Sequence, residues 1–147
     1  MTSRIVRAKE EDLSRIYNLE KETFENPWSF KMFELDYKSP FSSYYIMEED
    51  DKLLGYCCIS SILGEANLNN IAIAKKYRGS GKASIFMSFL MEELKKDKVE
   101  KILLEVRYNN REALGLYGKF GFKMIDRRKN YYGRNIDAII MEKEIGE

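Results

Sequence analysis

The chain has 147 residues, 44% of them hydrophobic, which is enough to bury the core of one domain. Its 25 basic and 24 acidic side chains nearly cancel, which excludes the basic excess of a general nucleic-acid binder. No apolar run approaches the roughly 20 residues that a membrane-spanning helix needs, and the charged N-terminus has no apolar signal core. We therefore expect one domain over residues 1–147, located in the cytoplasm, that binds neither nucleic acid nor membrane.

The chain has no histidine and only two cysteines, Cys57 and Cys58, which are adjacent. A vicinal disulfide would be strained, and two cysteines make no zinc site, so we interpret them as small apolar side chains packed in a strand. Without histidine the chain lacks the commonest general base and metal ligand. Acid–base chemistry must fall to carboxylate, tyrosine, lysine or cysteine, and we expect no metal site.

Hydrophobic periodicity and turn residues predict the elements in chain order. The predicted strands cover residues 4–8, 44–48, 53–63, 66–74, 101–106, 122–128 and 135–144. The predicted helices cover residues 10–24, 29–39, 81–96 and 109–120. For the last helix, Asn109 is the expected N-cap, Glu112 its capping-box partner and Gly121 the stop. Two strand–helix–strand passages, around the third and fourth helices, favour a partly parallel sheet.

The stretch Tyr77–Ser84, YRGSGKAS, lies between a predicted strand and a predicted helix and looks like a phosphate loop. Two positions exclude a nucleotide-binding P-loop, whose motif is G-x-x-x-x-G-K-S/T. Lys76 occupies the position of the first glycine, and Ala83 occupies the position of the final Ser or Thr. A helix N-terminus still presents unpaired N–H groups and a partial positive charge, to which Arg78 and Lys82 add. These eight residues alone leave an anion site and an ordinary surface turn both open.

A carboxylate and a tyrosine stand out further along the chain. Glu105 lies in a predicted strand that is otherwise apolar, where a charged side chain is either paired or functional. Arg107, two residues on and so on the same face, is the candidate partner. Tyr117 lies near the end of the following predicted helix, where it either packs that helix against a strand or takes part in chemistry.

Taken together, these motifs resemble the GNAT N-acetyltransferases. Arg78, Gly81 and Ala83 fit the R/Q-x-x-G-x-G/A acetyl-CoA loop of that family. Residues 104–122 are similar, more narrowly, to the ribosomal-protein-alanine N-acetyltransferases of the RimI type, as are NPWS, RRKNYY and DAIIM at 26–29, 127–132 and 137–141. The resemblance spans nearly the whole chain. It implies the GNAT fold, an α/β (α+β) architecture with a mixed, partly parallel, twisted sheet of about six to seven strands flanked by about four helices.

The resemblance implies that acetyl-CoA is the co-substrate and that backbone N–H groups of the loop hold its pyrophosphate. The strand before the loop would pair with the pantetheine arm like an added strand. Asn110 would contact the cofactor from the start of the next helix. The expected cofactor-binding residues are Ile71, Ala72, Ile73, Arg78, Gly79, Ser80, Gly81, Lys82, Ala83, Ser84 and Asn110.

In the implied reaction an amine attacks the thioester carbonyl of acetyl-CoA, and CoA leaves. The amine must be neutral, and an α-amino group, with a pKa of about 7.7–8.0 against about 10.4 for lysine, needs only modest help from a base. A buried carboxylate with a raised pKa would suffice. By resemblance, Glu105 is this base and Tyr117 is the acid that protonates the leaving sulfur. Backbone N–H groups after Asn70 would stabilise the oxyanion.

The implied acceptor is a protein N-terminus, which in this branch is the N-terminal alanine of a small-subunit ribosomal protein. Trp28 and Tyr131 are candidate walls of the peptide groove, and core or loop packing is an equal alternative for each. The other functions left open are a GNAT enzyme for a small-molecule amine or a protein lysine, a CoA-binding module without catalysis, and a nucleotide-binding switch.

Overall fold

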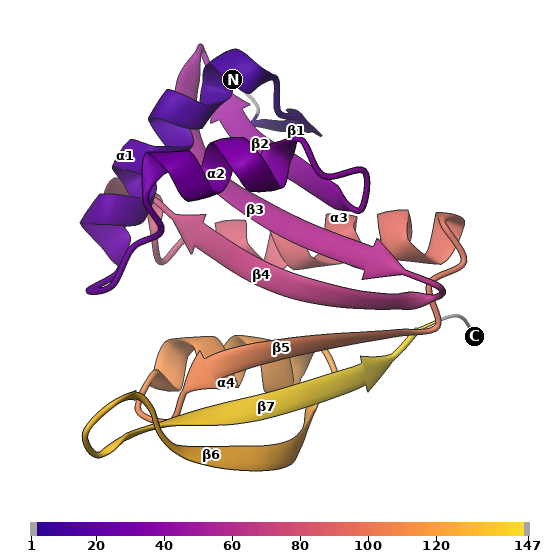
Figure 1. Ribbon diagram of the computed structural model, residues 1–147. Helices are drawn as coiled ribbons and strands as arrows, with labels where there is room; N and C mark the ends of the chain where they lie inside the picture. Colours follow the sequence, from indigo (N-terminus) through magenta and orange to yellow (C-terminus); the bar gives the residue numbers. More distant parts are fainter. Residues whose placement is uncertain (1–2, 146–147) are drawn as a thin grey trace. The chain divides into compact units, whose positions relative to one another are not determined.

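The structure is a computed structural model that describes residues 3–145. The strands are β1 (Arg4–Arg7), β2 (Ser42–Glu49), β3 (Lys52–Ile62), β4 (Glu65–Ile73), β5 (Lys101–Arg107), β6 (Lys123–Gly133) and β7 (Ile136–Glu144). The α-helices are α1 (Leu13–Thr23), α2 (Phe30–Tyr37), α3 (Lys82–Lys96) and α4 (Arg111–Lys119). The described strands form one seven-stranded sheet with the order β1-β2-β3-β4-β5-β7-β6 (Figure 1). The expected mixed sheet with four helices is confirmed.

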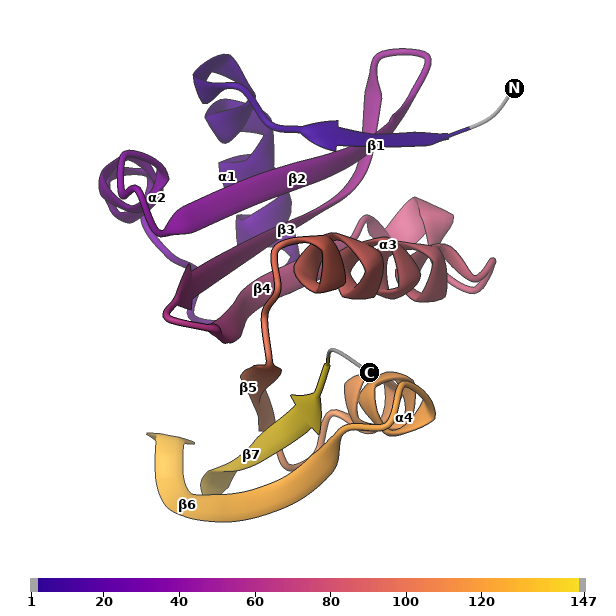
Figure 2. The same ribbon diagram turned by 90° about the vertical axis from the view of Figure 1, so that its right-hand side faces the viewer.

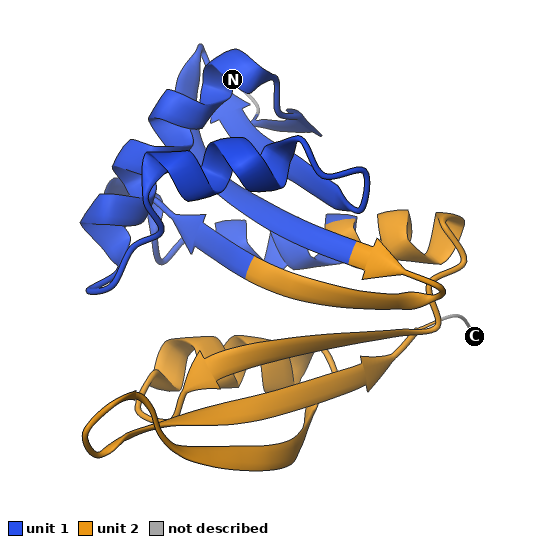
Figure 3. Cartoon of the chain, in the orientation of Figure 1, with its two compact units in different colours: residues 1–60, 70–89 blue, residues 61–69, 90–147 orange. Residues whose placement is uncertain are grey.

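By its internal contacts the chain forms two compact units (Figure 3). Unit 1 comprises the described residues up to Ser60 together with Asn70–Phe89. Unit 2 comprises Ser61–Asn69 together with the described residues from Leu90 onward. The boundaries fall inside β3, β4 and α3, so each unit contains a part of these three elements.

In unit 1, α1 and α2 lie on one face of the strands and the first half of α3 lies on the other (Figure 2). The alternation of side chains along β2 explains this arrangement. Tyr44 and Ile46 belong to the apolar cluster formed with α1 and α2, whereas Tyr45 meets Phe89 of α3 with ring centroids 5.1 Å apart. A strand with two apolar faces therefore becomes the middle layer of the unit.

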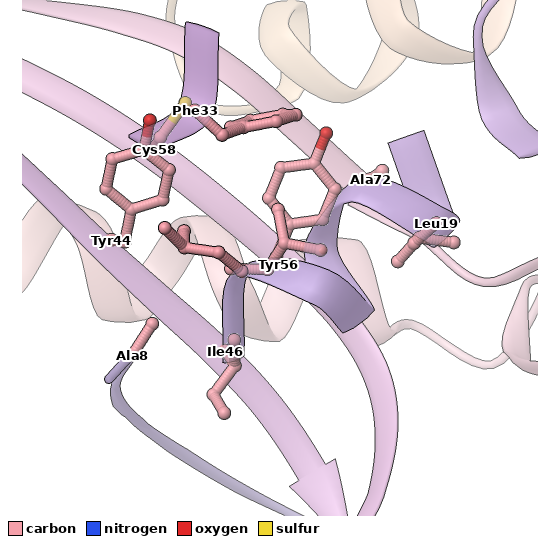
Figure 4. Packing of buried hydrophobic residues seen from close by; sticks show 10 residues of the cluster. Ala8, Leu19, Phe33, Tyr44, Ile46, Tyr56, Cys58 and Ala72 are labelled. Carbon is pink, nitrogen blue, oxygen red and sulfur yellow. The ribbon is translucent and has the colours of Figure 1, made fainter. Parts of the chain in front are cut away.

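The apolar cluster of unit 1 combines aromatic rings with smaller side chains (Figure 4). Its members are Ala8, Leu13, Ile16, Leu19, Phe33, Tyr44, Ile46, Tyr56, Cys58 and Ala72. The ring of Phe33 meets those of Tyr44 and Tyr56 edge to face, with centroids 6.2 and 6.3 Å away. Cys57 and Cys58 are both buried and unbridged, so their interpretation as strand-packing residues is confirmed.

In unit 2, β5 pairs in parallel with β4 over Glu65–Leu68 and antiparallel with β7, which pairs antiparallel with β6. A parallel pair needs a crossover, and α3 lies between β4 and β5 in the chain. The predicted partly parallel sheet is therefore confirmed. Gly121 follows α4 with a φ of +91°, a left-handed conformation that favours glycine, so the predicted helix stop is confirmed too.

The N-cap of α4 was predicted one residue too early. Asn110, rather than Asn109, caps the helix, and its Oδ1 accepts the N–H of Ala113 at 3.1 Å. Glu112 then lies at the second helical position instead of the third, so it cannot form the capping box that we expected. The pair of neighbouring asparagines gives the sequence two equally good caps, and the backbone turn after β5 selects the second.

Candidate active site

The segment between β4 and α3 has the geometry expected of an anion-binding loop. A short 3-10 turn spans Lys75–Tyr77, and α3 begins at Lys82. Gly79 and Gly81 have φ angles of +85° and +79°, which favour glycine. A Cβ atom added at either glycine would meet no described atom within 4 Å. The backbone of the loop is therefore open to a ligand from the side where side chains would otherwise stand.

Two side chains hold the loop in this conformation. Arg78 Nε donates a hydrogen bond to the carbonyl oxygen of Ile73 at 2.8 Å, which ties the loop back to the end of β4. Ser80 Oγ donates to the carbonyl oxygen of Tyr77 at 3.0 Å. Arg78 thus has a structural role in addition to the positive charge for which it was singled out.

The strand residues before the loop pack tightly against β3. Ala72 and Ile73 are buried, and the N–H of Ala74 donates to the carbonyl oxygen of Leu54 at 2.8 Å. Gly55 of β3 lies so close that an added Cβ would come within 2.7 Å of the carbonyl oxygen of Ala72. The candidate pantetheine-binding segment is therefore held along one edge by β3.

A buried carboxylate lies in the same unit. Glu20 of α1 is 2% exposed, and its Oε2 accepts the backbone N–H of Trp28 at 2.9 Å. Its Oε1 accepts the hydroxyl of Tyr56. The side-chain nitrogen of Asn70 lies 3.2 and 3.4 Å from the two oxygens. Burial raises the pKa of Glu20, although these three hydrogen bonds act to lower it. We call these four residues the Glu20 cluster.

Glu20 is not among the site residues predicted from the sequence, although a signal for it exists. Glu20 follows Ile16 by four residues and Leu13 by seven, which places it on the apolar face of α1. A carboxylate at a core position of an amphipathic helix must find partners, because burying an unpaired charge is costly. Asn70 was considered only for the backbone that follows it.

Trp28, a predicted groove wall, lies between α1 and α2 and is half-buried. Its ring lies 5.3 Å from that of Phe33, and its backbone N–H is held by Glu20. Ser29, the next residue, caps α2 by accepting the N–H of Met32 at 3.2 Å. Trp28 therefore packs at the margin of the core, as its alternative interpretation predicted, and its groove role stays a prediction.

The expectation that Glu105 is buried was wrong. Its side chain is 38% exposed, and its Oε1 lies 3.7 Å from Nη1 of Arg128. The neighbours Leu104 and Val106 are buried, and side chains alternate along a strand, so Glu105 lies on the opposite face of β5. The face of β5 that bears Glu105 is therefore accessible, which corrects the expectation of a buried carboxylate.

Aromatic and basic side chains of unit 2 surround Glu105. A hydrogen bond to Glu105, and the charge of that carboxylate, raise the pKa of Tyr131. The rings of Tyr131 and Tyr132 meet edge to face with centroids 5.2 Å apart, and burial raises the pKa of Tyr132 to about 12. Arg128 lies over Tyr131 at 5.6 Å from the ring centroid, and Arg107 over Tyr132 at 4.9 Å. The structure thus brings a predicted catalytic residue and a predicted groove wall together.

Tyr117, the predicted acid, lies in α4 of unit 2 and is 7% exposed. Its ring centroid lies 5.7 Å from that of Phe122. The side chain of Tyr117 therefore packs within unit 2. Among residues 3–145 the structure has no group of three or more His, Cys, Asp or Glu placed to hold a metal ion.

Residues 13–122 match the model of the Acetyltransferase (GNAT) family. The chain belongs to the GNAT family. The match includes the loop after β4 as well as Glu105 and Tyr117, so the resemblance inferred from the motifs is confirmed. A Bacillus subtilis strain 168 protein is 37% identical to this acetyltransferase over 139 residues, which are 93% of this chain and 92% of the relative. That protein is provisionally named a ribosomal protein bS18-alanine N-acetyltransferase.

Solved structures show the same GNAT fold. The crystal structure of the ribosomal-protein-S18-alanine N-acetyltransferase from Escherichia coli matches with a TM-score of 0.93 at 31% identity, covering 99% of this chain and 96% of that chain. Arabidopsis thaliana NAA60, solved in complex with acetyl-CoA, matches with a TM-score of 0.87 at 16% identity, covering 98% of this chain and 99% of that chain. At that identity, the second match supports the fold alone.

Proposed function

We propose that this GNAT protein transfers the acetyl group of acetyl-CoA to the N-terminal α-amine of a protein. The proposed acceptor is the N-terminal alanine of a small-subunit ribosomal protein, bS18 or its counterpart. The observation that carries this proposal is the similarity, along nearly the whole chain, to relatives named for that reaction. An N-terminal amine also suits a chain without histidine, because such an amine needs only a modest base.

In this proposal acetyl-CoA binds mainly to residues of unit 1. The pantetheine arm pairs with residues 71–73, and the pyrophosphate accepts hydrogen bonds from N–H groups of residues 79–84. The two open, left-handed glycines and the charges of Arg78 and Lys82 support that placement. Asn110 contributes its side-chain nitrogen, because its oxygen already caps α4.

The proposed chemistry uses two side chains of unit 2. Glu105 takes a proton from the acceptor amine, directly or through water, and the amine nitrogen then attacks the thioester carbon. The C–S bond breaks, the Tyr117 hydroxyl donates its proton to the leaving sulfur, and the second proton of the attacking nitrogen passes through water to the tyrosinate. Exposure supports Glu105 as the base, since a base must reach its substrate. Backbone N–H groups after Asn70 are the proposed oxyanion donors.

Tyr131 and Trp28 are each proposed to contact the acceptor peptide. Because Tyr131 is hydrogen-bonded to Glu105, a peptide held against Tyr131 would have its amine beside the proposed base. Trp28 supplies a flat ring, and the backbone N–H of Trp28 is hydrogen-bonded to Glu20. Both are aromatic residues with a polar atom at one end, a type favoured where a surface is partly wet.

We further propose that residues 1–147 act as one domain, because the family match runs through both units. The protein would work in the cytoplasm, where ribosomal proteins are made, with no nucleic-acid or membrane partner. None of the helices within residues 3–145 is long and apolar enough to cross a membrane.

The test is release of CoA from acetyl-CoA with two matched peptides. One begins with Ala-Arg and has a free N-terminus, and the other has a blocked terminus and an internal lysine. We expect turnover with the first peptide only. Turnover with the blocked peptide would instead indicate a lysine acetyltransferase. No turnover with either would leave an enzyme for small amines or a CoA-binding module.

A further inference from the structure

The Glu20 cluster joins three elements that are distant in the sequence. Trp28, Tyr56 and Asn70 lie 8, 36 and 50 residues from Glu20 and belong to the α1–α2 loop (residues 24–29), β3 and β4. Asn70 directly precedes the segment proposed to bind pantetheine, and Trp28 is proposed to contact the acceptor peptide. One carboxylate of unit 1 therefore contacts both parts of the proposed site.

The surroundings of Glu20 exclude a role as the base. The residue is 2% exposed, and each of its oxygens receives hydrogen bonds from protein donors. A base must lie within hydrogen-bond reach of the proton that it takes. Glu20 can therefore influence the reaction only through the groups that it holds.

The two parts of the proposed site depend on Glu20 to different degrees. The cofactor segment has a separate anchor, because the N–H of Ala74 donates to the carbonyl oxygen of Leu54 in β3. For the backbone of Trp28, the bond from its N–H to Glu20 is the anchor that joins it to α1. Loss of the carboxylate should therefore free the loop more than the cofactor segment.

We propose that Glu20 is a positioning residue that fixes the α1–α2 loop at Trp28 and thereby sets the affinity for the acceptor. This inference rests on the proposed function for its link to the acceptor. The part of the proposal that concerns the loop can be tested without any enzymatic activity. Trp28 is the only tryptophan of the chain, so its fluorescence can be measured separately. Tryptophan emission therefore reports on this loop alone.

The experiment compares Glu20→Asp with Ile16→Val. Each substitution removes one methylene group from a buried side chain of α1, and the two residues lie one helical turn apart. Only Glu20→Asp changes a member of the Glu20 cluster. Michaelis constants for the Ala-Arg peptide and for acetyl-CoA are measured, together with tryptophan emission, its quenching by acrylamide, and the melting temperature. Glu20→Gln, which keeps the side-chain length, replaces Glu20→Asp if the latter does not fold.

For Glu20→Asp we expect the peptide KM to rise about tenfold, the size expected when a hydrogen bond to a charged group is lost. We expect the KM for acetyl-CoA to stay within about twofold, and tryptophan emission to shift to longer wavelength with stronger quenching. For Ile16→Val we expect a lower melting temperature and no change in either KM or in emission.

Three results would overturn the proposal. The first is a lower melting temperature for both variants with an unchanged peptide KM, which is the mark of a merely structural residue. The second is an equal rise in both Michaelis constants. The third is unchanged emission and quenching in Glu20→Asp, which can be read even if the wild type acetylates neither peptide and the proposed function has failed.

Discussion

Glu20 of unit 1 is 2% exposed and accepts hydrogen bonds from three neighbours, whereas the side chain of Glu105 in unit 2 is 38% exposed and is met by Arg128 at 3.7 Å. A carboxylate enclosed by donors can hold its neighbours in place, but it cannot reach a substrate. An exposed carboxylate can exchange a proton with a bound amine. The comparison teaches that the exposure of the carboxylate, rather than an unusual sequence context, separates a candidate base from a positioning residue.

The largest expected effect is the loss of kcat in Glu105→Gln, which distinguishes the proposed base from the buried Glu20. Glu105→Gln should lower kcat by about 10²–10⁴-fold, because it removes the proposed base. Its melting temperature should change little, since an exposed side chain contributes little to stability. CoA release under saturating substrates measures kcat, and Glu112→Gln, on the same unit, is the control. Wild-type kcat in Glu105→Gln would remove Glu105 from the mechanism.

Tyr117→Phe extends the test to the proposed acid. The substitution keeps the ring that packs against Phe122 and removes only the hydroxyl. We expect kcat to fall by about 10²-fold, the low end for acid–base catalysis, because a thiolate leaves readily. The same CoA-release assay measures it, with circular dichroism to verify folding. If Tyr117→Phe and Glu105→Gln both turned over at the wild-type rate, the assignment of unit 2 as the catalytic region would be wrong.

Gly55→Ala tests the cofactor segment of unit 1. The new Cβ would stand 2.7 Å from the carbonyl oxygen of Ala72, so β4 must shift, at a cost of about 1–3 kcal/mol in the free energy of unfolding. The KM for acetyl-CoA should rise as well. Urea unfolding and initial rates give both values.

Gly115→Ala is the matched control for that substitution. Its added Cβ meets no described atom within 4 Å, and alanine favours a helix, so unfolding should cost up to about 1 kcal/mol more than in the wild type. A Gly55→Ala protein as stable as the wild type would contradict the close packing of β3 on β4.

The pH dependence of stability tests the burial of Glu20. Its pKa is raised in the folded state, so the folded protein holds the proton more tightly than the unfolded chain, for which 4.5 is the ordinary value. The contribution of the bound proton to the free energy of unfolding is therefore fully present below the pKa of the unfolded chain. This contribution is lost as the pH rises through the pKa of the folded protein.

We therefore expect the free energy of unfolding of the wild type, minus that of Glu20→Gln, to fall as the pH rises above 4.5. The fall should be about 1.4 kcal/mol for each unit by which the pKa is raised. Urea unfolding of both proteins across the pH range in which they stay folded measures the difference. A difference that grows with pH would mean that folding favours the charged form.

Arg128→Gln should have the smallest effect. The ion pair with Glu105 joins two partly exposed side chains, 51% and 38% accessible, and such pairs contribute about 0–1 kcal/mol to stability. We expect the melting temperature to change slightly and kcat to stay far above that of Glu105→Gln. A loss of kcat as large as that of Glu105→Gln would make Arg128 part of the chemistry.

Most of the fold could be predicted from the sequence because its signals are local. Alternating and helical periods located the strands and helices, and glycines located the loop and the end of α4. One error came where two local signals compete. Asn109 and Asn110 are both good caps, and only the backbone turn after β5 decides between them.

The site was less predictable because it depends on contacts between distant residues. The loop of residues 78–84 is continuous in sequence and could be recognised from its glycines. The role of Glu20 depends on its hydrogen bonds with Tyr56 and Asn70, which lie 36 and 50 residues away in the sequence. Glu105 looked buried because its strand is apolar, and the exposed face of that strand is a property of the folded unit.

The two buried cysteines have a practical consequence. Burial raises the pKa of both Cys57 and Cys58 and covers their sulfur atoms, so we expect neither thiol to react with electrophiles while the protein is folded. A chromogenic disulfide such as Ellman's reagent should therefore count only the thiol of released CoA, without background from the enzyme. Once the chain unfolds, both cysteines become reactive, and the same colour change reports the loss of the native state in a variant that has lost its activity.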